Sequence, residues 1–163
     1  MPPPNPKRAV KPLVLHAHTI HSAPAEQFPD PREGGNVSWK TLISAPVTLT
    51  DTLTAGIATC PVGSSVACPA REENENESSG HLKLHRHTQA ELYHVISGTG
   101  VVSIEGVEYE VGKGSVVFIP GDAEHGIRNV GDEELTWLYV FAADGFGEVV
   151  YRFSGDGAAK AKL

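Results

Sequence analysis

The sequence predicts one all-β domain built from many short antiparallel strands. Its 163 residues are close to the usual size of a single domain. The chain has 17 glycines and 12 prolines, and most of the glycines separate short β-branched runs between residues 80 and 157. This regular spacing of glycines between short runs favours a closed barrel or a double sheet of strands and disfavours a helical protein.

The N-terminal residues 1–37 are predicted to form an extended arm outside the barrel. Prolines are frequent in this part of the chain and preclude a helix at its start. Within the arm, residues 14–21 are interpreted as a short extended segment. Two histidines of this segment, His16 and His18, are interpreted as solvated side chains because no carboxylate or well-spaced third ligand lies nearby in the sequence.

The barrel is predicted to span residues 38–154, because short runs with β propensity follow one another there. Glycine-containing turns separate many of these runs. The acidic run 71–80 between two of them is interpreted as a solvated loop, and residues 155–163 as a flexible tail. The expected strands are residues 39–43, 53–59, 82–87, 91–96, 101–104, 107–110, 115–119, 126–130, 135–142 and 149–153.

Charge and apolar runs exclude several classes of partner. The 13 basic and 20 acidic residues give a net charge of −7, which argues against nucleic acid and anionic membranes. No apolar run approaches the ~20 residues of a membrane span, and no signal-like segment opens the chain, so a cytoplasmic location is expected.

The spacing of Cys60 and Cys68 fits no CxxC motif. Two free thiols are favoured, and a local disulfide between them is left open.

Three histidines and one glutamate form a candidate metal site. His85 and His87 share a face of their strand because side chains alternate, and Glu91 and His125 follow at the starts of later strands. Three imidazoles and one carboxylate suit a divalent transition metal such as Fe, Mn, Co, Ni, Cu or Zn. Four protein ligands leave positions open on an octahedral ion, which is typical of catalytic sites.

The segments around these ligands resemble the two motifs of the cupin family. In the first, Gly80 is followed by the histidine pair, Glu91 and Gly98; in the second, Gly114 is followed by Pro120, His125 and Asn129. Gly80 stands one residue closer to the histidine pair than is usual, and Gly121 directly follows Pro120, so loop geometry differs from the family pattern. The resemblance implies a double-stranded β-helix, or jelly-roll barrel, with the metal inside.

The alternation of side chains along the strands predicts which residues lie beside the candidate metal site. Tyr93 falls on the face of Glu91, and Lys83 on the face of His85. Tyr151 lies on a closing strand, in a run where alternate residues are apolar. A phenol near a divalent cation can act as a general base or donate to a developing oxyanion. For the strand at 135–142, both faces are largely apolar, so alternation does not decide which one points inward.

Within the family, the pattern is similar to small cupin lyases that cleave dimethylsulfoniopropionate. That resemblance rests on these residues: His85, His87, Glu91, Tyr93, His125 and Tyr151. It implies a substrate carboxylate on the metal, removal of the α-proton by a tyrosinate, and β-elimination.

The prediction is therefore a metal-dependent, lyase-like enzyme acting on a small carboxylate or carbonyl compound, with Tyr93, Tyr151 and Lys83 as catalytic candidates. An Fe(II)-dependent dioxygenase and a non-catalytic small-ligand binder are the alternatives. By analogy with the family, a homodimer is also expected.

Overall fold

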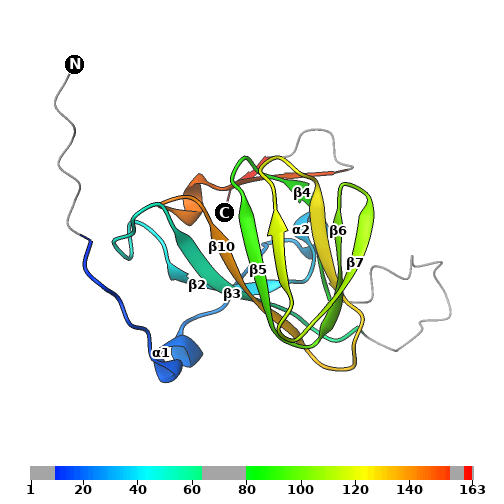
Figure 1. Cartoon of the computed structure of the whole chain (residues 1–163), viewed down its shortest axis with the longest axis horizontal. Helices are drawn as coiled ribbons and strands as arrows, with labels where there is room; N and C mark the ends of the chain where they lie inside the picture. Colours follow the sequence, from blue (N-terminus) through cyan, green and yellow to red (C-terminus); the bar gives the residue numbers. More distant parts are fainter. Residues whose placement is uncertain (1–9, 64–79, 155–159, 163) are drawn as a thin grey trace, which may run out of the picture.

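Two antiparallel sheets form a barrel in the computed structural model, which describes residues 10–63, 80–154 and 160–162 (Figure 1). Neighbouring strands in the first sheet follow the order β1-β2-β3-β10-β5-β8, and in the second β12-β11-β4-β9-β6-β7. The first sheet contains β1 (Glu26–Gln27), β2 (Ser38–Ile43), β3 (Thr54–Cys60), β10 (Leu135–Phe141), β5 (Glu91–Ser97) and β8 (Val116–Ile119). The second contains β12 (Lys160–Lys162), β11 (Val150–Phe153), β4 (His81–Arg86), β9 (His125–Asn129), β6 (Thr99–Ile104) and β7 (Val107–Gly112).

The predicted all-β architecture is confirmed. Every predicted run from residue 39 to 153 coincides with a strand from β2 to β11, with ends that differ by at most two residues. The remaining elements are two short α-helices, α1 (Ala17–Ser22) and α2 (Pro31–Gly34), and a 3₁₀ turn at Phe146–Glu148. Among the described residues, no helix has the length and apolar character needed to cross a membrane.

The core lies between the sheets and is lined by alternate residues of each strand. In β10, the first and every second residue are buried while those between are partly exposed. This decides the orientation that the sequence left open: Leu135, Trp137, Tyr139 and Phe141 point inward. The same alternation holds along the neighbouring β3.

A β-bulge in β4 changes which of its side chains point inward. In the pairing with β9, Leu82 faces Ile127 and His85 faces His125, so two residues of β4 oppose the single Gly126. A Cβ on Gly126 would lie 2.8 Å from the carbonyl oxygen of Leu82, which leaves no room for a side chain. Leu82 and His85 are consequently both buried although they are three residues apart.

The N-terminal arm is neither fully extended nor fully outside the barrel. The segment predicted as extended contains α1, because the prolines of this region lie outside residues 13–23. Lys40 holds the end of α1 by donating from Nζ to the carbonyls of Ile20 (3.2 Å) and His21 (2.8 Å). His16 and His18 are exposed, with their rings stacked 5.9 Å apart.

Residues further along the arm close the core. Strand β1 pairs with β2, and the neighbouring Phe28 is only 3% exposed. Its ring packs edge-on against Trp39 at 5.0 Å and Phe153 at 5.5 Å. The predicted tail likewise contains β12, which pairs with β11. Cys68 and most of the acidic run lie outside the described residues, whereas Cys60 is buried, which raises the pKa of its thiol.

Candidate metal centre

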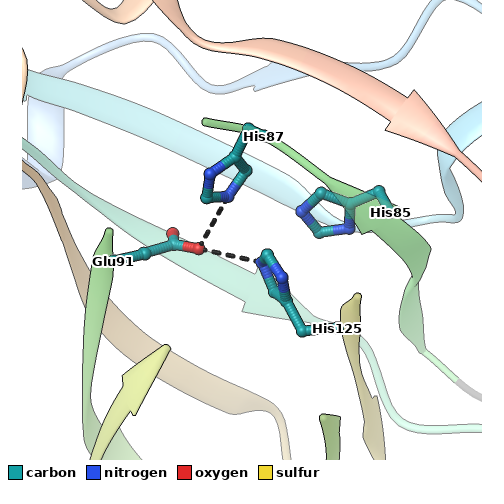
Figure 2. Close-up of side chains that lie close together, drawn as sticks. All are labelled: His85, His87, Glu91 and His125. Carbon is teal, nitrogen blue, oxygen red and sulfur yellow. Dashed lines mark hydrogen bonds and ion pairs between the residues drawn. The ribbon is translucent and has the colours of Figure 1, made fainter. Parts of the chain in front are cut away.

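Four buried side chains converge between the two sheets, as Figure 2 shows. His85 lies on β4, and His87 directly follows that strand; His125 opens β9 and faces His85 across the ladder. Glu91 opens β5 in the other sheet. One ligand atom from each of the four lies within 4.8 Å of the others, so the residues predicted as metal ligands are brought together.

The three imidazoles present their Nε2 lone pairs to the same point. Each Nδ1 donates to a backbone carbonyl two residues away: His85 to Lys83 (2.8 Å), His87 to Gln89 (2.9 Å) and His125 to Ala123 (2.9 Å). A carbonyl oxygen can only accept, so each Nδ1 carries the proton. In a neutral ring, Nε2 is then left as an unprotonated lone pair, the form in which histidine binds a metal.

The charges at the site fit a cation. Burial, together with the nearby imidazole of His125, lowers the pKa of His85 well below its usual value, so this ring is neutral. Burial raises the pKa of Glu91, but hydrogen bonds and charge from the rings of His125 and His87, which act when Nε2 carries a proton in the metal-free site, outweigh it, and the pKa lies below its usual value. Glu91 is therefore a carboxylate.

Its oxygen Oε2 lies 3.1 Å from Nε2 of His125 and 3.2 Å from Nε2 of His87. Within the described part of the chain, Nε2 of His85 is buried with no hydrogen-bond partner. A single divalent ion would satisfy all four electron-pair donors at once, so this donor set fits a transition metal.

The two predicted tyrosines both lie beside the ligands. Tyr151 stacks on His85, with ring centroids 4.4 Å apart, and Tyr93 lies 6.4 Å from His125. Both side chains are buried, at 5% and 1% exposure. Burial, reinforced by the negative charge of Glu91, raises the pKa of each phenol well above its usual value.

The third catalytic candidate, Lys83, does not share the ligand face. The bulge in β4 breaks the alternation on which that expectation depended, so Lys83 is turned away from His85. Its Nζ donates instead to the backbone carbonyl of Arg32 in α2, and Lys83 is not among the residues that line the cavity beside Glu91.

Glu91 lines a small cavity in the barrel, and aromatic side chains form most of its wall. Sequence reasoning nominated only Tyr93 and Tyr151 from this wall. The other aromatic residues that line it are Phe28, Trp39, Trp137, Tyr139 and Phe146. Trp137 and Tyr139 lie on a strand whose two faces are both largely apolar, so alternation did not single them out. Phe28 lies in the arm and gave no periodic signal.

Comparison with known proteins agrees with this geometry. Residues 74–141 match the family model described as the cupin domain. The chain is also 35% identical over 142 residues to the dimethylsulfoniopropionate lyase DddW of Ruegeria pomeroyi, covering 84% of this chain and 82% of the relative. The chain belongs to the cupin family. The predicted kinship with cupins of the dimethylsulfoniopropionate-lyase type is thus confirmed, and it supports the expectation of an enzyme.

Solved structures share the fold of this cupin. The polyketide cyclase RemF from Streptomyces resistomycificus superposes with a TM-score of 0.66 at 18% identity, covering 90% of this chain and 88% of the cyclase. A protein of Thermotoga maritima described as a predicted oxalate decarboxylase gives a TM-score of 0.62 at 21% identity, covering 80% and 99% of the two chains. The jelly-roll architecture expected from the two motifs is confirmed.

Proposed function

We propose that this cupin is a metal-dependent lyase that cleaves dimethylsulfoniopropionate into dimethyl sulfide and acrylate. The observation that carries the proposal is the set of His85, His87, Glu91 and His125 beside two buried tyrosines. These six residues stand in a chain that is 35% identical to a dimethylsulfoniopropionate lyase.

The four ligands would hold one divalent ion of the group Fe, Mn, Co, Ni, Cu and Zn. When bound, the ion would act as a Lewis acid for the substrate carboxylate and supply the positive charge that favours a phenolate over a phenol. Elemental analysis of the purified protein would identify it.

Tyr93 is proposed as the base and Tyr151 as the second phenol at the site. The phenolate oxygen of Tyr93 takes the proton from the carbon next to the carboxylate. The electron pair of that C–H bond forms the new C=C bond, and the C–S bond breaks with its electron pair going to sulfur. Acrylate and neutral dimethyl sulfide result, and the proton on Tyr93 is released to solvent before the next cycle.

The aromatic wall of the cavity supports a sulfonium-bearing substrate. Trp39, Trp137 and Phe146 line the cavity, and the faces of aromatic rings attract alkylated cations in a desolvated site. Among the described residues that line the cavity, none is a lysine or an arginine that would repel such a cation. A small cavity with this lining suits a short carboxylate that carries a dimethylsulfonium group.

The proposal is tested by incubating the metal-loaded protein with dimethylsulfoniopropionate, with and without oxygen, and measuring dimethyl sulfide and acrylate. We expect equal formation of both products in air and under argon, and none with His125→Ala. No cleavage by protein that contains a full equivalent of metal would refute the lyase. Turnover of a small carboxylate only in the presence of oxygen would assign a dioxygenase instead.

The homodimer and the cytoplasmic location stay predictions. Light scattering of the purified protein tests the first: a mass near twice the 17.3 kDa of one chain is expected, and a mass equal to one chain would contradict it.

A further inference from the structure

The turn that precedes His125 controls the orientation of that ligand. Residues 120–124 connect β8 to β9, and the carbonyl of Ala123 within the turn accepts the hydrogen bond from Nδ1 of His125. The backbone N–H of Asp122 donates to the carbonyl of His87 at 2.7 Å. The turn is thus in contact with two of the proposed ligands.

The conformation of this turn is not one that its sequence favours by itself. Asp122 has a φ of 62°, in the left-handed region that non-glycine residues seldom adopt. Gly121 packs so closely on the segment after β4 that a Cβ there would lie 2.4 Å from the carbonyl oxygen of Thr88. Such a conformation persists only when surrounding contacts hold it.

Arg86 supplies those contacts from the strand that carries the other two histidines. It lies between His85 and His87, so its side chain points to the outer face of the sheet. Its Nη1 donates to the carbonyl of Asp122 and to Oε1 of Glu105, both at 2.8 Å. One guanidinium therefore joins β4, the turn before β9 and the turn between β6 and β7.

Further bonds close a network around Arg86. The same Oε1 of Glu105 accepts from the backbone N–H of Glu124 at 2.5 Å, and the N–H of Glu105 donates to the carbonyl of Glu124 at 2.8 Å. Arg152 of β11 pairs with the carboxylate of Asp122, and Ser154, which directly follows β11, donates to the carboxylate of Glu124. Charge-assisted bonds of this kind are the stronger hydrogen bonds of proteins.

We infer that Arg86 is a positioning residue for the metal centre, which acts by holding the turn 120–124 and with it the ring of His125. The inference rests on the proposed assignment of the metal ligands. Without the guanidinium, the turn loses the donor to Asp122 and the bridge through Glu105, so the carbonyl of Ala123 no longer holds Nδ1 of His125 in place.

The test compares Arg86→Gln with Arg128→Gln, using Co²⁺ as the probe. Arg128 is a matched control because it forms an ion pair with Glu108 in the same sheet, at 2.7 Å and 3.1 Å, without touching the turn. Competition with a chelator gives the affinity, and the visible spectrum of bound Co²⁺ reports the ligand geometry. We expect Arg86→Gln to lower the affinity by about tenfold or more and to alter the spectrum, as loss of outer contacts to ligands commonly does. Arg128→Gln should change neither.

Unchanged affinity and spectrum in Arg86→Gln would overturn the inference while leaving the proposed function intact. Failure of the unaltered protein to bind any of the six metals would instead refute the metal site and the lyase together. The side chain of Arg86 is 40% exposed, so its loss should leave the metal-free fold stable, which thermal unfolding would verify. Should Arg86→Gln not fold, Glu105→Ala removes the oxygen that bridges Arg86 and Glu124, and an unchanged Co²⁺ affinity there would equally overturn the inference.

Discussion

Tyr151 lies nearly flat on His85, with ring planes 18° apart and centroids separated by 4.4 Å. His85 is thus held from two sides, by this ring and by the hydrogen bond from its Nδ1 to the carbonyl of Lys83. Tyr151 belongs to β11, which pairs with β4 through the register of Phe153 with His85. The orientation of His85 therefore depends on β11, a strand that comes late in the sequence.

Substitution of Tyr151 should separate the role of its ring from that of its hydroxyl. We expect Tyr151→Phe to keep the metal content and the free energy of unfolding, because the stacked ring remains. Tyr151→Ala should lower the free energy of unfolding by about 3 kcal/mol, the usual cost of removing a buried aromatic ring, and should lower the metal content. Urea unfolding of the metal-free proteins and elemental analysis measure the two effects. If both variants lost stability and metal content equally, the hydroxyl of Tyr151, rather than its ring, would hold the site.

Tyr93→Phe should retain the metal but lose turnover. Because the phenol is proposed to take the substrate proton, we expect kcat to fall by about 100-fold or more, the usual scale for a positioned base. Tyr109→Phe is the control, since Tyr109 is 50% exposed on β7. A near-normal kcat in Tyr93→Phe would reduce Tyr93 to a residue of the cavity wall.

His87→Ala and His125→Ala should each release the metal without unfolding the barrel. Each variant removes one of only three imidazole ligands, and Nε2 of both rings lies beside the carboxylate of Glu91. Elemental analysis gives the metal content and circular dichroism reports the strands, with the exposed His94→Ala as control. A full equivalent of metal in both variants is the result that would disprove the ligand assignment.

Gly126→Ala should destabilise the barrel at the β4 bulge. The new methyl group would lie 2.8 Å from the carbonyl oxygen of Leu82 and 3.1 Å from the backbone nitrogen of Leu84, so the backbone must shift. We expect the free energy of unfolding to fall by about 1–3 kcal/mol, as for other overpacked sites. Gly112→Ala is the control, because its Cβ would meet nothing closer than 3.7 Å. Equal stability of the two variants would mean that the bulge tolerates a side chain.

The strands of the barrel were predictable because local signals specify them. Glycine turns such as Gly106 and Gly114 adopt left-handed φ values that few other residues reach, and they mark strand ends within the sequence. The bulge in β4 was not predictable from alternation, because a bulge is a property of the pairing with β9 and not of β4 itself. This is why Lys83 was expected on the face of His85, whereas the structure buries Leu82 beside the core and turns Lys83 away.

The proposed ligands could be predicted from their spacing in the sequence, whereas the cavity wall could not. His85, His87 and Glu91 lie within seven residues of one another and carry a recognisable spacing. Phe28 reaches the cavity from the arm only after the barrel has formed, and a single phenylalanine among prolines and polar residues carries no periodicity. The helix α1 was also not predicted, because it has no buried apolar face and no N-cap side chain, the two features by which a helix is recognised in a sequence.

Phe28 contacts Trp39 and Tyr151, and it lines the cavity although none of the metal ligands comes from its segment. The proposed metal ligands thus belong to the barrel, whereas part of the cavity wall belongs to the residues that precede it. Under selection, these two parts can change separately: substitutions around Phe28 can reshape the space for a substrate while the ligand geometry is inherited unaltered. Related cupins that share the four ligands can in this way diverge in substrate through a segment that carries none of them.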